Sequence, residues 1–162
     1  MTGQQIGVLI GVIAGGSWAL AGSASLRGAP RVLAMIVSLV GSILLAVATA
    51  RLPSNGEAGR FDGAIYGIAV TAEAIAIVVA VPVLRRLGRG DWLVPVIAMI
   101  VGLHFLGLWR ATGDAVFVGL AAGLCAIGIM GVRVPASWRM LVVGFGCALV
   151  LWAAAAATIL SS

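Results

Sequence analysis

Apolar residues fill six long runs of the chain, and polar and charged residues gather in the short stretches between them. A helix needs about 20 mostly apolar residues to cross the hydrocarbon core of a bilayer, and each run comes close to that length. Arginine, proline and clusters of small polar residues mark the breaks. The pattern predicts six transmembrane helices, over 5–26, 31–50, 63–84, 92–110, 114–131 and 139–160.

The composition also indicates a membrane protein. Of the 162 residues, 62% are hydrophobic and only 9% are charged, and the mean hydropathy of +1.20 lies far from that of soluble domains. The longest connector, ARLPSNGEAGRFDG, leaves no room for a separate soluble domain. We therefore expect an all-α polytopic integral membrane bundle, one domain over 1–162, with consecutive helices antiparallel. The residues before the first run lack the basic region of a cleavable signal peptide, so we expect that run to be retained.

The charged residues predict an orientation. Ten arginines stand against five acids, and lysine is absent, which excludes a Schiff base to retinal or pyridoxal. The connectors after the first, third and fifth helices hold seven arginines: Arg27, Arg31, Arg85, Arg86, Arg89, Arg133 and Arg139. The opposite side holds Arg51, Arg60 and Arg110, balanced by acids. The positive-inside rule predicts a multi-pass protein of the inner (plasma) membrane with both termini outside, whose arginines contact lipid headgroups rather than nucleic acid.

Glycines recur in the first helix at a spacing that is used in helix packing. Gly3, Gly7, Gly11 and Gly15 form three overlapping Gly-x-x-x-Gly units. Glycine at this spacing lets helix backbones approach closely where lipid supplies no hydrophobic drive. Two uses stay open: tight packing within one bundle, and a homodimer through the first helix.

Glu73 is the strongest single signal in the sequence, because it lies about halfway through the third apolar run with no charged residue near it. A carboxyl group at that depth costs on the order of 2.5 kcal/mol unless it is paired, hydrated or protonated. Tyr66 and Asp62 precede it by seven and eleven residues, so all three fall on one helix face. They form a predicted polar stripe from the outer surface to the middle of the membrane, and Asp62 at its outer end is a candidate for binding a substrate.

His104, the only histidine, lies in the run IVGLHFLGLWR of the fourth helix. Because that helix runs antiparallel to the third, His104 should lie within about 5 Å of the depth of Glu73. Neighbouring helix axes are about 8–10 Å apart, so the two side chains can meet. Three interpretations stay open: a shared functional cavity, a purely structural pair, or unrelated positions. One histidine and one carboxylate fall short of the three protein ligands of a catalytic zinc, and we expect no metal or other cofactor.

Several other residues are candidates for lining a binding site. Trp18 and Trp152 lie deeper in their helices than the other tryptophans, which favours a pocket over an interfacial anchor. Arg110 and Asp114 bracket the turn RATGD, where an ion pair and a cap on the fifth helix are expected. Arg110 is also a candidate for contact with an anionic headgroup or substrate. Serines of the first two helices either line a cavity or bond to their own backbone.

The run VGLHFLGLWRATGDAVFVGL resembles a family of small uncharacterised bacterial six-helix membrane proteins. In that family a Gly-x-His-Phe-x-x-Leu motif opens the outer half of the fourth helix, and Gly102, His104, Phe105 and Leu108 are the similar positions. The likeness covers about 20 residues. The resemblance implies the six-helix architecture and no activity.

Three functional hypotheses follow from these residues. The first is proton-linked transport or binding of a small solute, with Glu73 and His104 exchanging the proton. The second is a membrane-embedded enzyme acting on a lipid or isoprenoid, with Glu73 as general acid or base, His104 or Tyr66 as its partner, and Trp18 or Trp152 shielding the substrate. The third is a non-catalytic partner subunit that binds through its glycine faces.

Overall fold

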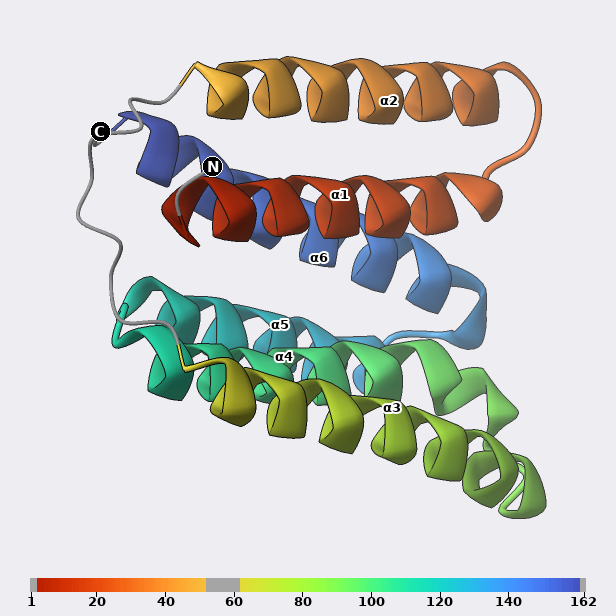
Figure 1. Ribbon diagram of the computed structural model, residues 1–162. Helices are drawn as coiled ribbons and strands as arrows, with labels where there is room; N and C mark the ends of the chain where they lie inside the picture. The colour runs from red at the N-terminus through yellow and green to blue at the C-terminus, as the bar shows by residue number, and fades with distance from the viewer. Residues whose placement is uncertain (1–2, 52–61, 161–162) are drawn as a thin grey trace. The chain divides into compact units, whose positions relative to one another are not determined.

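The structure, a computed structural model, describes residues 3–51 and 62–160 (Figure 1). The described residues form six α-helices and one 3₁₀ turn: α1 (Gly3–Ala24), α2 (Ala29–Ala50), α3 (Gly63–Arg86), η1 (Gly90–Trp92), α4 (Leu93–Thr112), α5 (Val116–Arg133) and α6 (Ala136–Leu160). All six α-helices are long and apolar enough to cross a membrane. The predicted all-α six-helix membrane fold is therefore confirmed. The middle of the predicted long connector lies outside the described residues.

The chain's contacts divide it into two compact units. One unit contains α1, α2 and the part of α6 from Gly144 onward, and the other contains α3, η1, α4, α5 and the part of α6 up to Val143. The helix α6 is unbroken and contributes to both units. That the six helices make a single domain stays a prediction.

In the first unit, α1 and α2 form an antiparallel hairpin (Figure 1). Gly28, with φ of +63°, makes the turn between them, because that backbone conformation strongly favours glycine. Proline in the first turn of α2 suits the fixed φ of a helix start. Gly16 allows the close approach of the two helices, since a Cβ there would lie 2.6 Å from Ser42 Oγ.

The glycine face of α1 packs against α6 of the same chain. A Cβ built on Gly15 would lie 2.6 Å from the indole of Trp152. Further along, a Cβ on Gly144 of α6 would lie 2.6 Å from the Cα of Gly22. These contacts correspond to the intramolecular use of the small residues, and the homodimer stays a prediction.

In the second unit, α3, α4 and α5 pack as consecutive neighbours (Figure 1). Glycines bring α4 and α5 together, since a Cβ on Gly128 would lie 2.7 Å from the carbonyl oxygen of Pro95, and one on Gly102 would lie 3.1 Å from that of Ala121. Gly113, in the left-handed conformation with φ of +78°, ends α4, and its N–H donates to the carbonyl of Trp109.

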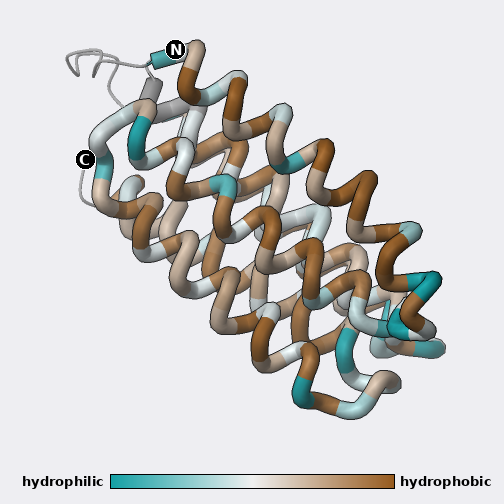
Figure 2. Tube along the Cα trace, turned by 90° about the horizontal axis from the view of Figure 1, so that it is seen from below, coloured by the Kyte–Doolittle hydropathy of each residue, from teal (hydrophilic) through white to brown (hydrophobic). Residues whose placement is uncertain are grey.

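Hydroxyl side chains within the helices bond to their own helix. Each of the following donates to the carbonyl four residues earlier: Ser17, Ser23, Ser38, Ser42, Thr49, Thr71, Thr112 and Thr158. The helices are mostly hydrophobic along their length, and hydrophilic positions gather towards the turns (Figure 2). This distribution fits helices whose outer faces contact lipid.

Candidate functional site

The antiparallel pairing of α3 and α4 brings the candidate residues together. At one end of the pair, the N–H of Asp62 donates to the carbonyl of Ala111 over 2.9 Å. Deeper along both helices, Gly107 faces Ala69 so closely that a Cβ on Gly107 would overlap the Ala69 side chain. One turn further along each helix lie Glu73 on α3 and His104 on α4.

Glu73 and His104 touch. Oε2 of Glu73 lies 3.1 Å from Nδ1 of His104, and the side chains are 23% and 10% exposed. Glu73 is the eleventh of the 24 residues of α3, and His104 is the twelfth of the 20 residues of α4, so both lie near the middle of their spans. The predicted similarity of depth thus corresponds to a direct contact between the two side chains.

The contact between Glu73 and His104 has the length of a hydrogen bond but not its alignment. The separation is that of a hydrogen bond, yet Nδ1 of His104 makes no aligned hydrogen bond, so the carboxyl oxygen lies off the direction of a ring N–H. The pair is net neutral with the proton on either group, which lowers the cost of placing it inside a membrane.

Aromatic rings surround the imidazole of His104. The ring of Tyr66 meets it edge to face at a centroid distance of 6.0 Å, and the ring of Phe105 does so at the same distance. Tyr66 and Glu73 contact the same imidazole from one helix, as their seven-residue spacing predicts. The structure therefore brings together Glu73, His104 and Tyr66.

The other predicted polar residues near these helices have local roles. The carboxylate of Asp62 caps α3, since its Oδ1 accepts hydrogen bonds from the N–H groups of Ala64 and Ile65. Asp114 accepts from the N–H of Val116 at the start of α5, as predicted. Among the described residues Arg110 makes no ion pair with Asp114, and its side chain is exposed. The expected Arg110–Asp114 ion pair is thus wrong, and the hydrogen bond that Asp114 does make is the one from the first N–H of α5.

The two deeper tryptophans belong to the first unit, whereas Glu73 and His104 belong to the second. Trp152 packs on Gly15, and its indole nitrogen is buried without a hydrogen-bond acceptor among the described residues. Trp18 lies on α1, where its carbonyl oxygen is close to Gly144 of α6. A role for Trp18, Trp152, Asp62 or Arg110 in binding a substrate stays a prediction.

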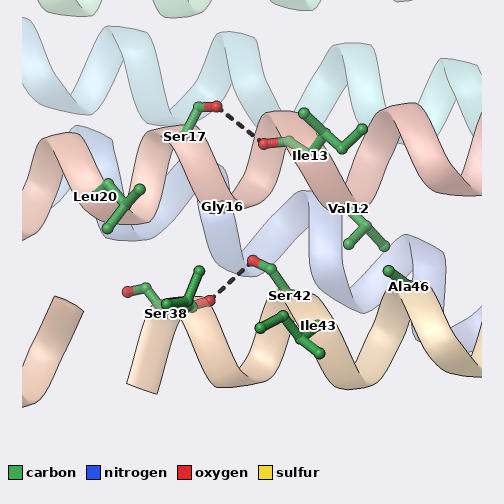
Figure 3. Close-up of a pocket in the computed structure, with 10 residues that line it drawn as sticks. Val12, Ile13, Gly16, Ser17, Leu20, Ser38, Ser42, Ile43 and Ala46 are labelled. Carbon is green, nitrogen blue, oxygen red and sulfur yellow. Dashed lines mark hydrogen bonds between the residues drawn. The ribbon is translucent and has the colours of Figure 1, made fainter. Parts of the chain in front are cut away.

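Two features were not predicted from the sequence. The first is a groove between α1 and α2 with a volume of about 260 Å³, lined by apolar side chains and by Gly16, Ser17, Ser38 and Ser42 (Figure 3). The sequence predicts that serines of the first two helices either line a cavity or bond to their own backbone. These three serines line the groove and also donate to carbonyls of their own helices. No sequence pattern gives the groove, because it depends on how side chains of two helices fit together.

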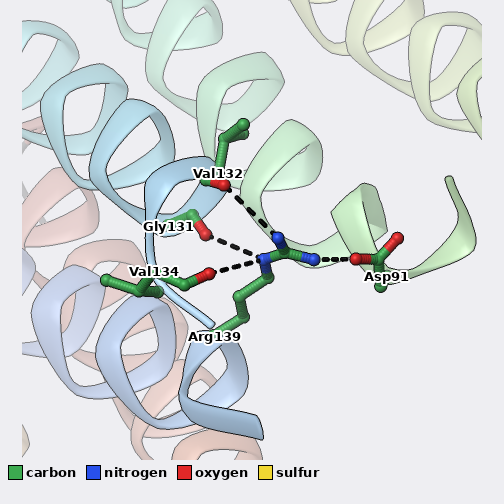
Figure 4. Close-up of polar contacts among 5 residues, drawn as sticks. All are labelled: Asp91, Gly131, Val132, Val134 and Arg139. Carbon is green, nitrogen blue, oxygen red and sulfur yellow. Dashed lines mark hydrogen bonds and ion pairs between the residues drawn. The ribbon is translucent and has the colours of Figure 1, made fainter. Parts of the chain in front are cut away.

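The second feature is a cluster of hydrogen bonds around Arg139 at the start of α6 (Figure 4). Its Nε donates to the carbonyls of Gly131 and Val134, over 3.2 and 3.1 Å, and Nη2 donates to that of Val132 over 3.3 Å. Nη1 forms an ion pair with Asp91. Arg139 therefore caps the carboxyl end of α5, where a cation is also favoured by the helix dipole.

Comparison with protein-family models, with curated proteins and with solved structures finds no match to the chain. The membrane class and the candidate site therefore rest on the sequence and geometry of the chain itself. The resemblance of 102–108 to a bacterial six-helix family stays a prediction.

Proposed function

We propose that the protein binds or transports a small solute in a proton-linked manner, with Glu73 and His104 as the proton-exchanging pair and Tyr66 beside them. The observation that carries the proposal is the 3.1 Å contact between a carboxyl and an imidazole near the middle of two apolar helices. Intramembrane carboxyl and imidazole groups are typical of proton relays, and histidine titrates near neutral pH.

The net charge of the Glu73–His104 pair depends on how many protons the pair holds. With one proton shared between them, Glu73 and His104 are either both neutral or an ion pair, and the site carries no net charge. A second proton makes the site net positive, and loss of the shared proton makes it net negative. Each change alters the electrostatic free energy of a charged or polar solute bound nearby, which couples proton exchange to solute binding.

Proton uptake by this pair is directly measurable. In difference infrared spectra of the reconstituted protein during a pH titration, we expect a protonated-carboxyl band that Glu73→Gln removes. His104→Gln should change the frequency of this band, because the carboxyl loses the imidazole that lies 3.1 Å from it. Asp114→Asn is the control, since asparagine can accept the same hydrogen bond from the N–H of Val116 and the carboxyl removed lies at the start of α5. A band that persists in Glu73→Gln contradicts the proposal.

Transport is tested in proteoliposomes that contain a pH-sensitive dye. A panel of alkali cations, small amines, amino acids and monocarboxylates should include a solute whose movement changes the internal pH. Glu73→Gln should reduce this change to the level of protein-free liposomes, while Asp114→Asn retains it. If Glu73→Gln leaves it intact, the pair is not the coupling site.

Two other outcomes would support the alternative functions. Product formed from a lipid extract in detergent, without a gradient, supports the lipid enzyme. Co-purification with another membrane protein, together with tolerance of Glu73→Gln, supports a partner subunit.

We further propose that both termini face outward and that seven arginines face the cytoplasm, on the basis of the arginine count alone. Exposed positions at two turns allow a test: Ala115 between α4 and α5, and Ser137 at the start of α6. In a chain whose native cysteines are replaced by alanine, an impermeant maleimide should label Ala115→Cys in intact cells and Ser137→Cys only after lysis. The reverse result inverts the topology.

A further inference from the structure

The groove between α1 and α2 suits a long apolar molecule. Much of its lining is aliphatic, including Val12 and Ile13 from α1 and Leu39 and Ile43 from α2 (Figure 3). Its volume of about 260 Å³ is below the roughly 300–1,000 Å³ of pockets that enclose drug-sized ligands. The groove therefore fits a segment of an elongated molecule better than a whole compact solute.

The serines in the groove do not favour a polar ligand. The hydroxyl protons of Ser17, Ser38 and Ser42 are donated to carbonyls of their own helices, over 3.0, 2.7 and 2.8 Å. These hydroxyl groups offer no free proton to a ligand, so an anionic or carbonyl group gains little from them. A hydrocarbon chain leaves these hydrogen bonds intact.

Positive charge lies beyond one end of the groove. Arg31 precedes Ser38 by seven residues on α2, which places it on the same helix face and about 10 Å away along the axis. Arg27 lies in the turn that joins the two helices. Both side chains are exposed, and among the described residues the ion pairs involve neither of them. Exposed cations beyond an apolar groove complement an anionic amphiphile.

We propose that the α1–α2 hairpin binds one anionic phospholipid, with its phosphate at Arg27 and Arg31 and one acyl chain in the groove. The groove extends over nine residues of each helix, from Val12 to Leu20 on α1 and from Ser38 to Ala46 on α2, a rise of about 12 Å. One leaflet of the hydrocarbon core is about 15 Å deep, so a chain whose phosphate sits at the arginines reaches the near end of the groove with about its inner third. The site belongs to the first unit and does not depend on the proposed function of Glu73 and His104.

Native mass spectrometry of the full-length protein in detergent tests this site with two defined probes. Phosphatidylglycerol and phosphatidylcholine with identical acyl chains are titrated separately, and bound lipid is counted. We expect one phosphatidylglycerol to be retained at concentrations where phosphatidylcholine is not. The double variant R27Q/R31Q should weaken retention about 30-fold, since each arginine near an anionic surface contributes roughly one fivefold step.

The groove is tested by Ser17→Phe, which places a large side chain at an exposed lining position and should also weaken retention of phosphatidylglycerol. Matched controls are R85Q/R86Q, a second exposed arginine pair, and Val78→Phe on the exposed face of α3. Neither should change retention. Equal binding of the two lipids, loss in R27Q/R31Q but not in Ser17→Phe, or displacement of the lipid by inorganic phosphate would each overturn the proposal.

Discussion

Arg139 and Glu73 are ionisable side chains on apolar helices, and they are accommodated in different ways. Arg139 lies at a helix start and gives its guanidinium N–H groups to three backbone carbonyls and to Asp91. Glu73 lies near the middle of α3 and has the imidazole of His104 as its neighbour. The guanidinium of Arg139 donates mainly to carbonyls of the backbone, which do not titrate. Glu73, in contrast, contacts an imidazole, and both of these groups can gain or lose a proton. We therefore expect Arg139 to matter for stability and Glu73 for function.

Replacement of Arg139 by glutamine should destabilise the fold, because carbonyls at the end of α5 lose charged donors. The expected loss is about 1–3 kcal/mol, measured as a lower thermal midpoint in detergent. Arg133→Gln is the matched control, since Arg133 is exposed in the last turn of α5. Asp91→Asn should have the smaller effect of an exposed ion pair, about 0–1 kcal/mol. Equal midpoints for Arg139→Gln and Arg133→Gln would remove the capping role.

Among the helices, the separation of α3 and α4 decides whether the candidate site exists. The two helices approach closely at Gly107 of α4 and Ala69 of α3. Gly107 lies one turn from His104, and Ala69 lies one turn from Glu73. A helix pair held further apart would leave the carboxyl and the imidazole without each other. The contact between Glu73 and His104 thus depends on Gly107, a residue that takes no part in the polar contact itself.

Gly107→Ala tests this dependence. The added methyl group meets the Ala69 side chain, so we expect a loss of about 1–3 kcal/mol from overpacking, together with a changed frequency of the Glu73 carboxyl band. At Gly119 a Cβ meets nothing within 4 Å, and Gly119→Ala should be neutral or stabilise by up to about 1 kcal/mol through helix propensity. If Gly107→Ala leaves both the stability and the frequency of the carboxyl band unchanged, α3 and α4 are not held together at this point.

For the whole molecule, the sequence predicts what depends on periodicity and composition. The six spans follow from run length, and their observed ends lie within three residues of the prediction. The similar depth of Glu73 and His104 follows from helical spacing and a short connector between antiparallel helices, but whether the two side chains face each other depends on helix rotation, which the sequence left open. The α1–α2 groove and the Arg139 cap were not predictable, because the first depends on side-chain fit across two helices and the second on backbone carbonyls that have no sequence signature.

The hydroxyl groups described above also bear on how the chain enters a bilayer. When the serines and threonines of a helix already donate to carbonyls of that helix, the helix can move from the insertion channel into lipid before another helix is present. Most of the helices meet this condition. In contrast, α3 carries Glu73, and the neighbour of Glu73, His104, is synthesised later as part of α4. Release of α3 and α4 together, as a hairpin, spares the carboxyl an unpaired passage into lipid. The contact that we assign to proton exchange in the finished protein thus also favours one order of events during its synthesis.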